Sequence, residues 1–431
     1  MRLDGVDMGG AGPARLLMGG TLGFHIILAC LGIALPTIVV AAEAIGLRRQ
    51  DGTAMLLARR WSQVLAVLVA VGAVTGTVLS FEMSLLWPGL MERYGAVLGL
   101  PFGLEGVFFL LEAVFTAIYV YGWNRLPPRV HIWTGVPVII SGLAGAASVV
   151  AVNAWMNQPG GFTVVDGVVT RVDPWRVFFN GAFGYEVPHM ILAAYMVSGF
   201  LVASVYAAGW LRGRRDRYHR LGFLIPFAIA GVLAPVQVLV GDVAARAIAK
   251  DQPVKFAAME YVTTTGPHQP EYLGGVYVDG KVYGALRIPD LDSILVGFSP
   301  DTVVQGLDSV PVELRPPSPT LLHLSFDLMV LIGTALVLLP LWAVVLRRLP
   351  RTKWFWWAAV AAGPAAVVAM ECGWIVTEVG RQPWVVYGLL KTSDAATTDD
   401  VTGILTFVVI GYTGLAAATI WVLRRMARRW R

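Results

Sequence analysis

The stretch WFWWAAVAAGPAAVVAMECGWIVTEVGRQPW, residues 354–384, joins a long apolar run to a short polar ending. The run 354–379 is long enough to cross a membrane, because a spanning helix needs about 20 apolar residues. Glu378, Arg381 and Trp384 stand where hydrocarbon would meet water. Trp and Arg favour membrane borders, so an interfacial anchor accounts for Trp384 and Arg381. It does not account for Glu378 on the apolar side, where an ionisable group is costly and usually marks a functional site.

Long apolar runs of this kind recur along the whole chain. Of 431 residues, 56% are hydrophobic and 14% charged, whereas a soluble protein carries about 25% charged residues. Backbone groups in lipid must be satisfied within each segment, so the runs indicate helices and not a barrel. The first run is too long to be the apolar part of a cleavable signal peptide. We predict an all-α polytopic membrane protein with about nine transmembrane helices, at roughly 16–47, 62–88, 97–121, 131–156, 187–211, 221–246, 319–346, 354–379 and 402–423.

Basic residues gather on alternate sides of these spans. Of the 33 Lys and Arg residues, 20 fall in short connections and in the C-terminal tail, at 48–60, 125–129, 212–220, 347–353 and 424–431. Cytoplasmic loops are enriched in Lys and Arg, so we expect the N-terminus outside and the C-terminus in the cytoplasm. The net charge of +5 then reflects topology, and we expect no nucleic-acid partner.

Four side chains that can bind iron are expected in the outer half of the membrane. His25 and His189 lie within spans that enter from outside, as does Met329, and Glu378 reaches the same side at the exit of its span. His and Met together hold a six-coordinate haem iron, whereas one His or carboxylate alone leaves a position open for oxygen. A single membrane histidine is as readily a hydrogen-bonding group between helices, and Met329 alone is most simply a core residue. Their convergence favours haem ligation.

Acidic side chains also recur inside the predicted spans. Glu105 and Glu112, in GLEGVFFLLEAVF, are seven residues apart, which places them on one helical face about 10 Å apart along the axis. Glu371 and Glu378 repeat this spacing, and Glu82 adds a further acid. Such acids can be protonated groups that hydrogen-bond neighbouring helices. Chains of acids within membranes commonly relay protons, and with several in register we favour that role.

One hydrophilic segment, residues 247–318, interrupts the apolar pattern on the outer side. A connection this long, rich in Gly, Pro, Asp, Val and Tyr, is typically functional or disordered. We expect it to lie away from the buried iron ligands. The shorter connection 157–186 is expected to hold some local structure around 175–179. The segment divides the chain into three parts, residues 1–246, 247–318 and 319–431.

Together these motifs resemble subunit I of the cytochrome bd-type quinol oxidases, in the class with a short quinol-binding loop. The resemblance rests on GRQPW at 380–384, FHI at His25, FEM at Glu82, LEG and LEA at Glu105 and Glu112, VNAWMNQP at 152–159, His189, and F-x-x-M ending at Met329. It implies nine spans in a prokaryotic cytoplasmic membrane and three haems, two of type b and one of type d. His189 and Met329 would hold the low-spin haem b. His25 and Glu378 would hold the high-spin haem b and haem d, in an order that the motifs leave open, with Arg381 and Trp384 nearby.

The start of the hydrophilic segment, QPVKFAAME, resembles the K-x-A-A-x-E element of the family's quinol-binding loop. The resemblance makes Lys255 and Glu260 quinol contacts, able to hydrogen-bond quinol and accept its protons. Without it, both residues would be taken for solvated loop charges. Some family members carry Arg two residues before the Met ligand, where this chain has Asp327. An acid there would lower the potential of a neighbouring haem.

The resemblance implies a quinol:oxygen oxidoreductase. Quinol would be oxidised at the outer face and oxygen reduced to water with cytoplasmic protons passed through Glu105 and Glu112, which generates a proton-motive force without a pump. A second large helical subunit is implied, and often a small single-span one, within a membrane that supplies quinol. The alternatives are an oxidase with only b-type haems and, from another class, a proton-coupled transporter or channel that would need no iron ligands.

Overall fold

Nine long helices run the length of the molecule in the computed structural model, which describes residues 12–166 and 168–430. Each is long and apolar enough to span a membrane, which confirms the predicted fold class for the described residues. They are α1 (Gly12–Arg49), α2 (Gly52–Leu86), α3 (Pro88–Gly122), α4 (Pro128–Asn157), α6 (Phe183–Leu211), α7 (Arg217–Asp251), α10 (Pro319–Val345), α11 (Lys353–Gly380) and α13 (Thr402–Arg429).

Several helices extend beyond the apolar runs that predicted them, because local chemistry sets their ends. The carboxylate of Asp51 accepts hydrogen bonds from the backbone N–H groups of Thr53, at 3.0 Å, and Ala54, at 3.3 Å. Such a cap satisfies donors that have no partner within the helix. As a result α2 begins at Gly52, well before the predicted start at 62. Proline occupies the first turn, where its missing N–H costs nothing, of α3, α4 and α10.

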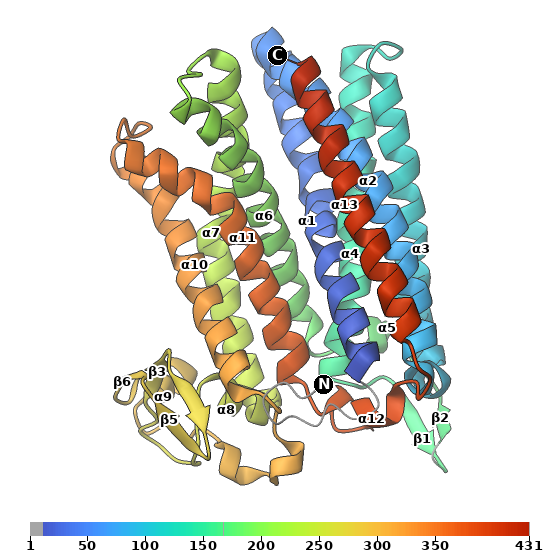
Figure 1. Cartoon of the computed structure of the whole chain (residues 1–431), viewed down its shortest axis with the longest axis vertical. Coiled ribbons are helices and arrows are strands. Elements are labelled where there is room, and N and C mark those ends of the chain that lie inside the picture. The colour runs from blue at the N-terminus through green and yellow to red at the C-terminus, as the bar shows by residue number, and fades with distance from the viewer. Residues whose placement is uncertain (1–11, 167, 431) are drawn as a thin grey trace.

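α1 stands between two groups of helices (Figure 1). α2, α3 and α4 lie on one side, α6, α7, α10 and α11 on the other, and α13 crosses in front of α1 and α2. α1 contributes side chains to three apolar clusters. Ile26 packs in the cluster that contains Phe200, Leu17 in the cluster that contains Trp155, and Leu35 in the third. Burial of α1 therefore joins the two groups.

The two ends of the bundle differ in chemistry. Arg48 and Arg49 end α1, and Arg428 and Arg429 end α13, so we call their end of the molecule the basic end. The opposite end, the loop end, carries the first residues of α1 and the hydrophilic segment (Figure 1). The clustering of basic side chains thus coincides with one end of the bundle.

The hydrophilic segment folds into short elements at the loop end. α7 continues to Asp251, so the segment begins later than the predicted residue 247. Two antiparallel pairs form, β3 with β6 and β4 with β5. The elements are α8 (Pro253–Met259), β3 (Glu271–Leu273), β4 (Val276–Val278), β5 (Lys281–Tyr283), β6 (Leu286–Ile288), α9 (Leu291–Gly297) and the 3-10 turns η1 (Leu307–Ser309) and η2 (Val312–Leu314).

Two other connections at this end are also ordered. The connection after α4 holds the hairpin β1 (Thr163–Val165) and β2 (Val168–Thr170), followed by α5 (Pro174–Phe178). This confirms the expected local structure near 175–179. The connection after α11 holds the pair β7 (Trp384–Val386) and β8 (Leu390–Lys391), then α12 (Thr392–Ala395).

A buried polar group ties three helices together near the basic end. His131 Nδ1 lies 2.7 Å from Glu43 Oε1, and the Tyr119 hydroxyl donates to Glu43 Oε2 at 2.5 Å. His131 Nε2 faces the Tyr119 carbonyl oxygen at 2.9 Å. Both ring nitrogens face oxygen atoms, so hydrogen bonds hold the ring on both sides. All three side chains are buried, so each depends on the others for its hydrogen bonds.

Replacing Glu43 with Gln should lower the free energy of unfolding by about 3 kcal/mol, because it breaks a buried pair and leaves polar atoms of His131 and Tyr119 poorly satisfied. Unfolding of the detergent-solubilised protein would measure the loss. Arg176→Gln is the control, since Arg176 is 81% exposed in its ion pair with Asp173 and such pairs contribute little. Equal stability of the two variants would contradict the assigned buried pair.

Candidate functional site

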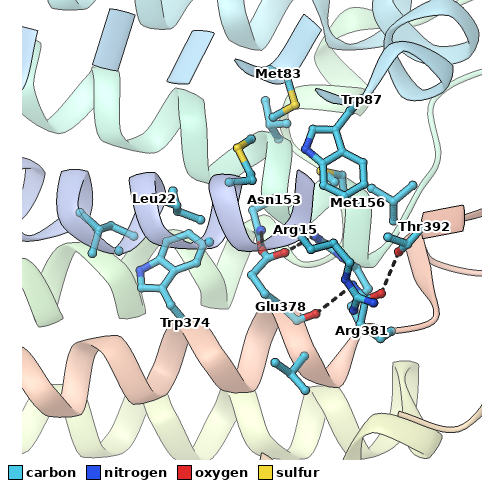
Figure 2. A pocket seen from close by; sticks show the side chains of 18 of the residues that line it. Arg15, Leu22, Met83, Trp87, Asn153, Met156, Trp374, Glu378, Arg381 and Thr392 are labelled. Atoms are coloured by element: carbon cyan, nitrogen blue, oxygen red, sulfur yellow. Dashed lines mark hydrogen bonds and ion pairs between the residues drawn. The ribbon is translucent and has the colours of Figure 1, made fainter. Parts of the chain in front are cut away.

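A cavity of about 370 Å³ opens among α1, α3, α4 and α11 at the loop end. Its polar lining is small and comes mainly from Arg15, Asn153, Glu371, Glu378 and Arg381. Figure 2 shows Glu378 between Asn153 and Arg381, with apolar side chains around the remaining wall. The cavity is therefore an apolar chamber with one polar corner.

Glu378 is held by two donors at this corner. Asn153 Nδ2 donates to Oε1 at 2.5 Å, and Arg381 Nη2 donates to Oε2 at 2.6 Å. The Arg381 side chain is 3% exposed, and its Nε and Nη1 atoms have no partner among the described residues. A charge-assisted hydrogen bond of this kind is about twice as strong as a neutral one. The guanidinium thus fixes the carboxylate and retains donors for another anionic group.

The rest of the GRQPW run lies next to this corner. Gln382 Nε2 donates to the Glu378 carbonyl oxygen at 3.3 Å, and Gln382 Oε1 accepts from the Thr392 hydroxyl at 2.8 Å. The amide of Gln382 therefore links the end of α11 to α12. Trp384 begins β7 and lies under the Lys391 ammonium, 5.9 Å from the ring centroid. Trp384 lies in the connection after α11 and is not among the residues that line the cavity.

His25 faces α2 and not the cavity. Its Nδ1 atom lies 2.8 Å from the hydroxyl oxygen of Thr75, and a Cβ on Gly76 would approach its Cε1 atom to 3.1 Å. The opposite side of α1 lines the cavity through Gly23 and Ile26. Hence His25 and Glu378 occupy separate environments on either side of α1, and Nε2 of His25 has no hydrogen-bond partner among the described residues.

His189 and Met329 are also set against glycines. A Cβ on Gly241 of α7 would lie 3.3 Å from His189 Cε1, and one on Gly373 of α11 would lie 3.1 Å from Met329 Sδ. The Gln237 amide nitrogen approaches His189 Nε2 at 3.2 Å, while the buried Nδ1 atom has no partner. Glycine at these positions permits an approach that a side chain would block.

The predicted proton carriers lie on α3. Glu112 projects between α1 and α4, where a Cβ on Gly32 would lie 3.5 Å, and one on Gly142 3.6 Å, from its Oε1 atom. Neither Glu112 nor Glu105 makes a hydrogen bond to another described residue. Both are half-buried. The alternative expectation, acids hydrogen-bonded to neighbouring helices, thus has no support from the contacts of α3.

Glu82 and Glu371 have surroundings that differ from those of Glu105 and Glu112. Glu82 Oε2 accepts a hydrogen bond from the Thr21 hydroxyl at 2.6 Å, which ties α2 to α1. Glu371 lines the cavity, and a Cβ on Gly23 would lie 3.3 Å from its Oε2 atom. Both Glu82 Oε1 and Glu371 Oε1 lack a partner among the described residues. Glu371 is therefore a second acid on the cavity wall, seven residues before Glu378 on the same helix.

The position of Lys255 contradicts the expectation that the hydrophilic segment lies away from the proposed iron ligands. The side chain is 3% exposed, and a Cβ on Gly380 would come within 2.9 Å of its Cγ atom. Burial lowers the pKa of Lys255 to about 8, and the nearby Arg381 cation acts in the same direction. The carboxylates of Glu186 and Glu378 partly oppose this shift. Lys255 is thus a buried cation beside the GRQPW corner and not a solvated loop charge.

Glu260 lies at the end of the same short helix but faces other groups. It is 4% exposed and is surrounded by Glu271, Asp292 and Asp327. Burial and these carboxyls raise the pKa of Glu260 well above its ordinary value. Lys255 and Glu260 therefore lie in different environments, one beside Glu186 and Glu378 and one in an acidic cluster.

Asp327 anchors the hydrophilic segment to α10. Its Oδ2 atom accepts a hydrogen bond from Gly274 N–H at 2.5 Å and lies 3.3 Å from His323 Nε2. His323 Nδ1 donates to the Met259 carbonyl oxygen at 2.6 Å, and its ring stacks on Tyr261 with centroids 3.8 Å apart. The sequence suggested that Asp327 would act on a haem, whereas its observed partners are the segment and His323.

Sequence reasoning did not assign roles to Asn153, Glu186 or His323. Asn153 and Asn157 stand four residues apart in VNAWMNQP, a spacing that places both on one helical face. Asn157 Nδ2 donates to Glu186 Oε1 at 2.7 Å, next to Lys255. This spacing of amides was the available signal, but their acidic partners lie far away in sequence.

The donor set fits a haem. Among the described residues, no three His, Cys, Asp or Glu side chains gather into a site for a bare metal ion. A haem brings its own equatorial nitrogens and needs one or two axial ligands from His, Met or similar groups. The unpartnered Nδ1 of His189, the sulfur of Met329 beside Gly373, and Glu378 at the cavity satisfy that need. The spare donors of Arg381 suit the carboxylates that a haem carries.

Comparison with known proteins agrees with this interpretation. The family model described as "Cytochrome bd terminal oxidase subunit I" matches residues 13–430. A Bacillus subtilis (strain 168) protein, provisionally named a cytochrome bd menaquinol oxidase subunit I, is 38% identical over 95% of each chain. The cytochrome bd-II ubiquinol oxidase subunit 1 of Escherichia coli (strain K12) is 25% identical over 86% of this chain and 87% of its own.

A solved structure extends the likeness to three dimensions. The structure of bd oxidase from Geobacillus thermodenitrificans superposes with a TM-score of 0.92 at 38% identity and covers 97% of this chain and 98% of its own. The family accounts for haem cofactors, a quinol substrate and a second subunit as general properties. With nine apolar helices among its described residues, the chain belongs to the cytochrome bd terminal oxidase subunit I family, as part of a quinol-oxidising enzyme of the bacterial plasma membrane.

Proposed function

We propose that this chain is the haem-bearing subunit of a quinol:oxygen oxidoreductase that oxidises quinol at the loop end and reduces oxygen to water. The basic end would face the cytoplasm and the N-terminus the outside. The observation that carries the proposal is the Glu378 carboxylate, fixed by Asn153 and Arg381 at the polar corner of an apolar cavity. Haem extraction from the purified protein, with quinol-dependent oxygen consumption, tests it.

His189 and Met329 would hold a low-spin haem b, and His25 and Glu378 would hold a high-spin haem b and a haem d. When bound, these haems carry electrons from quinol to oxygen and supply the iron at which oxygen is reduced. Thr75 would orient His25 through its Nδ1 atom, which leaves Nε2 for ligation. Asn153 and Arg381 would keep the Glu378 carboxyl directed into the cavity.

Protons for water formation would come from the basic end along α3. Glu112 lies about 10 Å closer to that end than Glu105, at 1.5 Å per residue. Their lack of hydrogen-bond partners among the described residues supports a transfer role, since an acid fixed by two partners would exchange protons slowly. With quinol protons released at the other end, charge is separated without a pump.

Quinol would be oxidised next to α8. Lys255 connects this helix to the GRQPW corner, and Glu260 connects it to carboxyl groups of the hydrophilic segment. We assign Lys255 to quinol binding and charge balance near Glu378, and Glu260 to proton acceptance.

A second large helical subunit would cover part of the lipid-facing surface, joined in some enzymes by a small single-span subunit. The α3 and α13 helices support this, because large apolar side chains such as Leu110 and Phe407 are 62% and 77% exposed. Lipid would cover the remainder.

Replacing His189 with Ala, or Met329 with Leu, should abolish the low-spin haem signal, because a His/Met pair defines a six-coordinate iron. Reduced-minus-oxidised spectra of the purified protein would measure it. Met370→Leu is the matched control, since Met370 is a buried core residue of α11 with no assigned ligand role. An unchanged low-spin spectrum in both ligand variants would refute the assignment.

Replacing Lys255 or Glu260 with Ala should lower quinol turnover, with different effects on the haems. Lys255→Ala should also change the absorption of the haem assigned to Glu378, because Lys255 packs on Gly380. Glu260→Ala should leave haem content and spectra intact. Lys281→Ala, at an exposed position of β5, serves as the control. Wild-type turnover in both variants, at matched haem content, would exclude α8 as the quinol side.

Glu112→Gln should slow the oxygen-reducing step at least about tenfold, because it removes a proton carrier of the kind that general acid–base catalysis requires. Stopped-flow oxidation of the fully reduced enzyme by oxygen, with proton uptake followed by a pH dye, would measure this. Glu92→Gln is the control on the same helix, at an exposed position. Wild-type kinetics and proton uptake in Glu112→Gln would show that this acid only fills space.

A further inference from the structure

Three acidic side chains from different parts of the hydrophilic segment are buried together at the loop end. Glu260 ends α8, Glu271 begins β3 and Asp292 lies in the first turn of α9. Their exposed fractions are 4%, 8% and 1%. Carboxylates are rarely buried unless paired. Folding of the hydrophilic segment therefore buries three carboxyl groups that an open loop would expose to water.

The fold holds this cluster in place through neighbouring contacts. The Gln269 backbone N–H donates to the Ser293 hydroxyl at 2.9 Å, which ties the approach to β3 to α9. Leu307 N–H donates to the Val262 carbonyl oxygen at 2.9 Å and closes the segment over the end of α8. Glu260 is close enough to Glu271 and Asp292 for their charges to raise its pKa. The three acids therefore influence one another's protonation.

The cluster lacks the partners that a structural role would require. Glu260 Oε2 and Asp292 Oδ2 are buried without a hydrogen-bond partner among the described residues. The other charged groups that face the cluster are Asp327, which adds negative charge, and His323, whose nitrogens face Met259, Gly274 and Asp327. Lys255 lies beside Glu186 and Glu378 instead. The two unpartnered carboxyl oxygens of the cluster therefore remain available to exchange protons.

We propose that Glu260, Glu271 and Asp292 form a relay that receives the protons of quinol and passes them to water at the outer surface. This extends the proposed quinol site, on which it rests. Oxidation of one quinol breaks two O–H bonds and yields one quinone, two protons and two electrons. The electrons go to the haems of the oxidase and the protons to the carboxylates, with Glu260 first.

The proton affinities of Glu271 and Asp292 suit such a transfer. Burial, with the neighbouring carboxyls, raises the pKa of Glu260 well above its ordinary value, that of Glu271 to about 7 and that of Asp292 to about 8. Groups with pKa values near the working pH exchange protons most effectively. Two residues from Asp292, Asp290 pairs with His268 at 3.1 Å, and both side chains are largely exposed, at 43% and 55%. The cluster therefore ends close to solvent.

The test compares Glu271→Gln and Asp292→Asn in the whole oxidase with Asp279→Asn, an exposed turn residue, as control. Each relay variant should lower kcat for quinol oxidation at least about threefold, with KM changed less than about twofold, because proton acceptance and not binding is impaired. The acid limb of the kcat–pH profile should move to lower pH in Glu271→Gln, since removing a neighbouring carboxylate lowers the pKa of Glu260. Glu271→Asp retains a carboxyl and should restore most of the rate.

Haem content and spectra should stay at the wild-type level in every relay variant, which separates a proton effect from misfolding. Wild-type kcat and pH profile in both Glu271→Gln and Asp292→Asn would overturn the relay. If Glu260→Gln still slows quinol oxidation in that case, the proposed quinol site stands and only the relay fails. If Glu260→Gln is also without effect, the quinol site itself is wrong. A slower rate with an unshifted pH profile that Glu271→Asp does not restore would also reject the relay.

Discussion

Hydrocarbon provides no hydrogen-bond partner, and this constraint decides where the polar side chains of the nine helices lie. Thr21 meets Glu82, Asn153 meets Glu378, and His131 meets Glu43, each time across a boundary between helices. These pairs specify which helices are neighbours, because apolar surfaces alone pack with little preference in lipid. The polar atoms left without partners, including those of His189 and Arg381, then stand out as places prepared for another group.

Glycines that pack closely against the proposed iron ligands also shape these sites. Gly76, Gly241 and Gly373 each face a proposed iron ligand at a separation where a Cβ atom would make an unusually tight contact. Small residues at helix contacts are common in membranes because they let backbones approach. Here the approach also confines the ligand, since a ring or thioether pressed against a backbone has few rotamers to choose from. Ligand orientation is therefore a property of helix packing.

The sequence predicted the nine helices well because each apolar run carries its own signal, independent of the rest of the chain. It also marked the GRQPW corner, since Glu378 and Arg381 are three residues apart on one helix. It could not predict partners that are distant in sequence. Asn153 and Glu378 are 225 residues apart, and the cluster of Glu260, Glu271 and Asp292 forms only when the hydrophilic segment folds. The burial of Lys255 could not be predicted for the same reason, because hydrophilic neighbours in sequence do not reveal packing against Gly380.

The long separation between Asn153 and Glu378 also has a consequence for biosynthesis. Ribosomes add about 5–20 residues per second, so the interval between synthesis of the two residues is about 11–45 s. Through this interval α1 and α4 are already inserted while one wall of the chamber has not been made. The chamber is complete only after translation has passed α12. A prosthetic group that binds there must arrive late, when nearly the whole chain is in the membrane, and any factor that delivers it acts on an almost finished subunit.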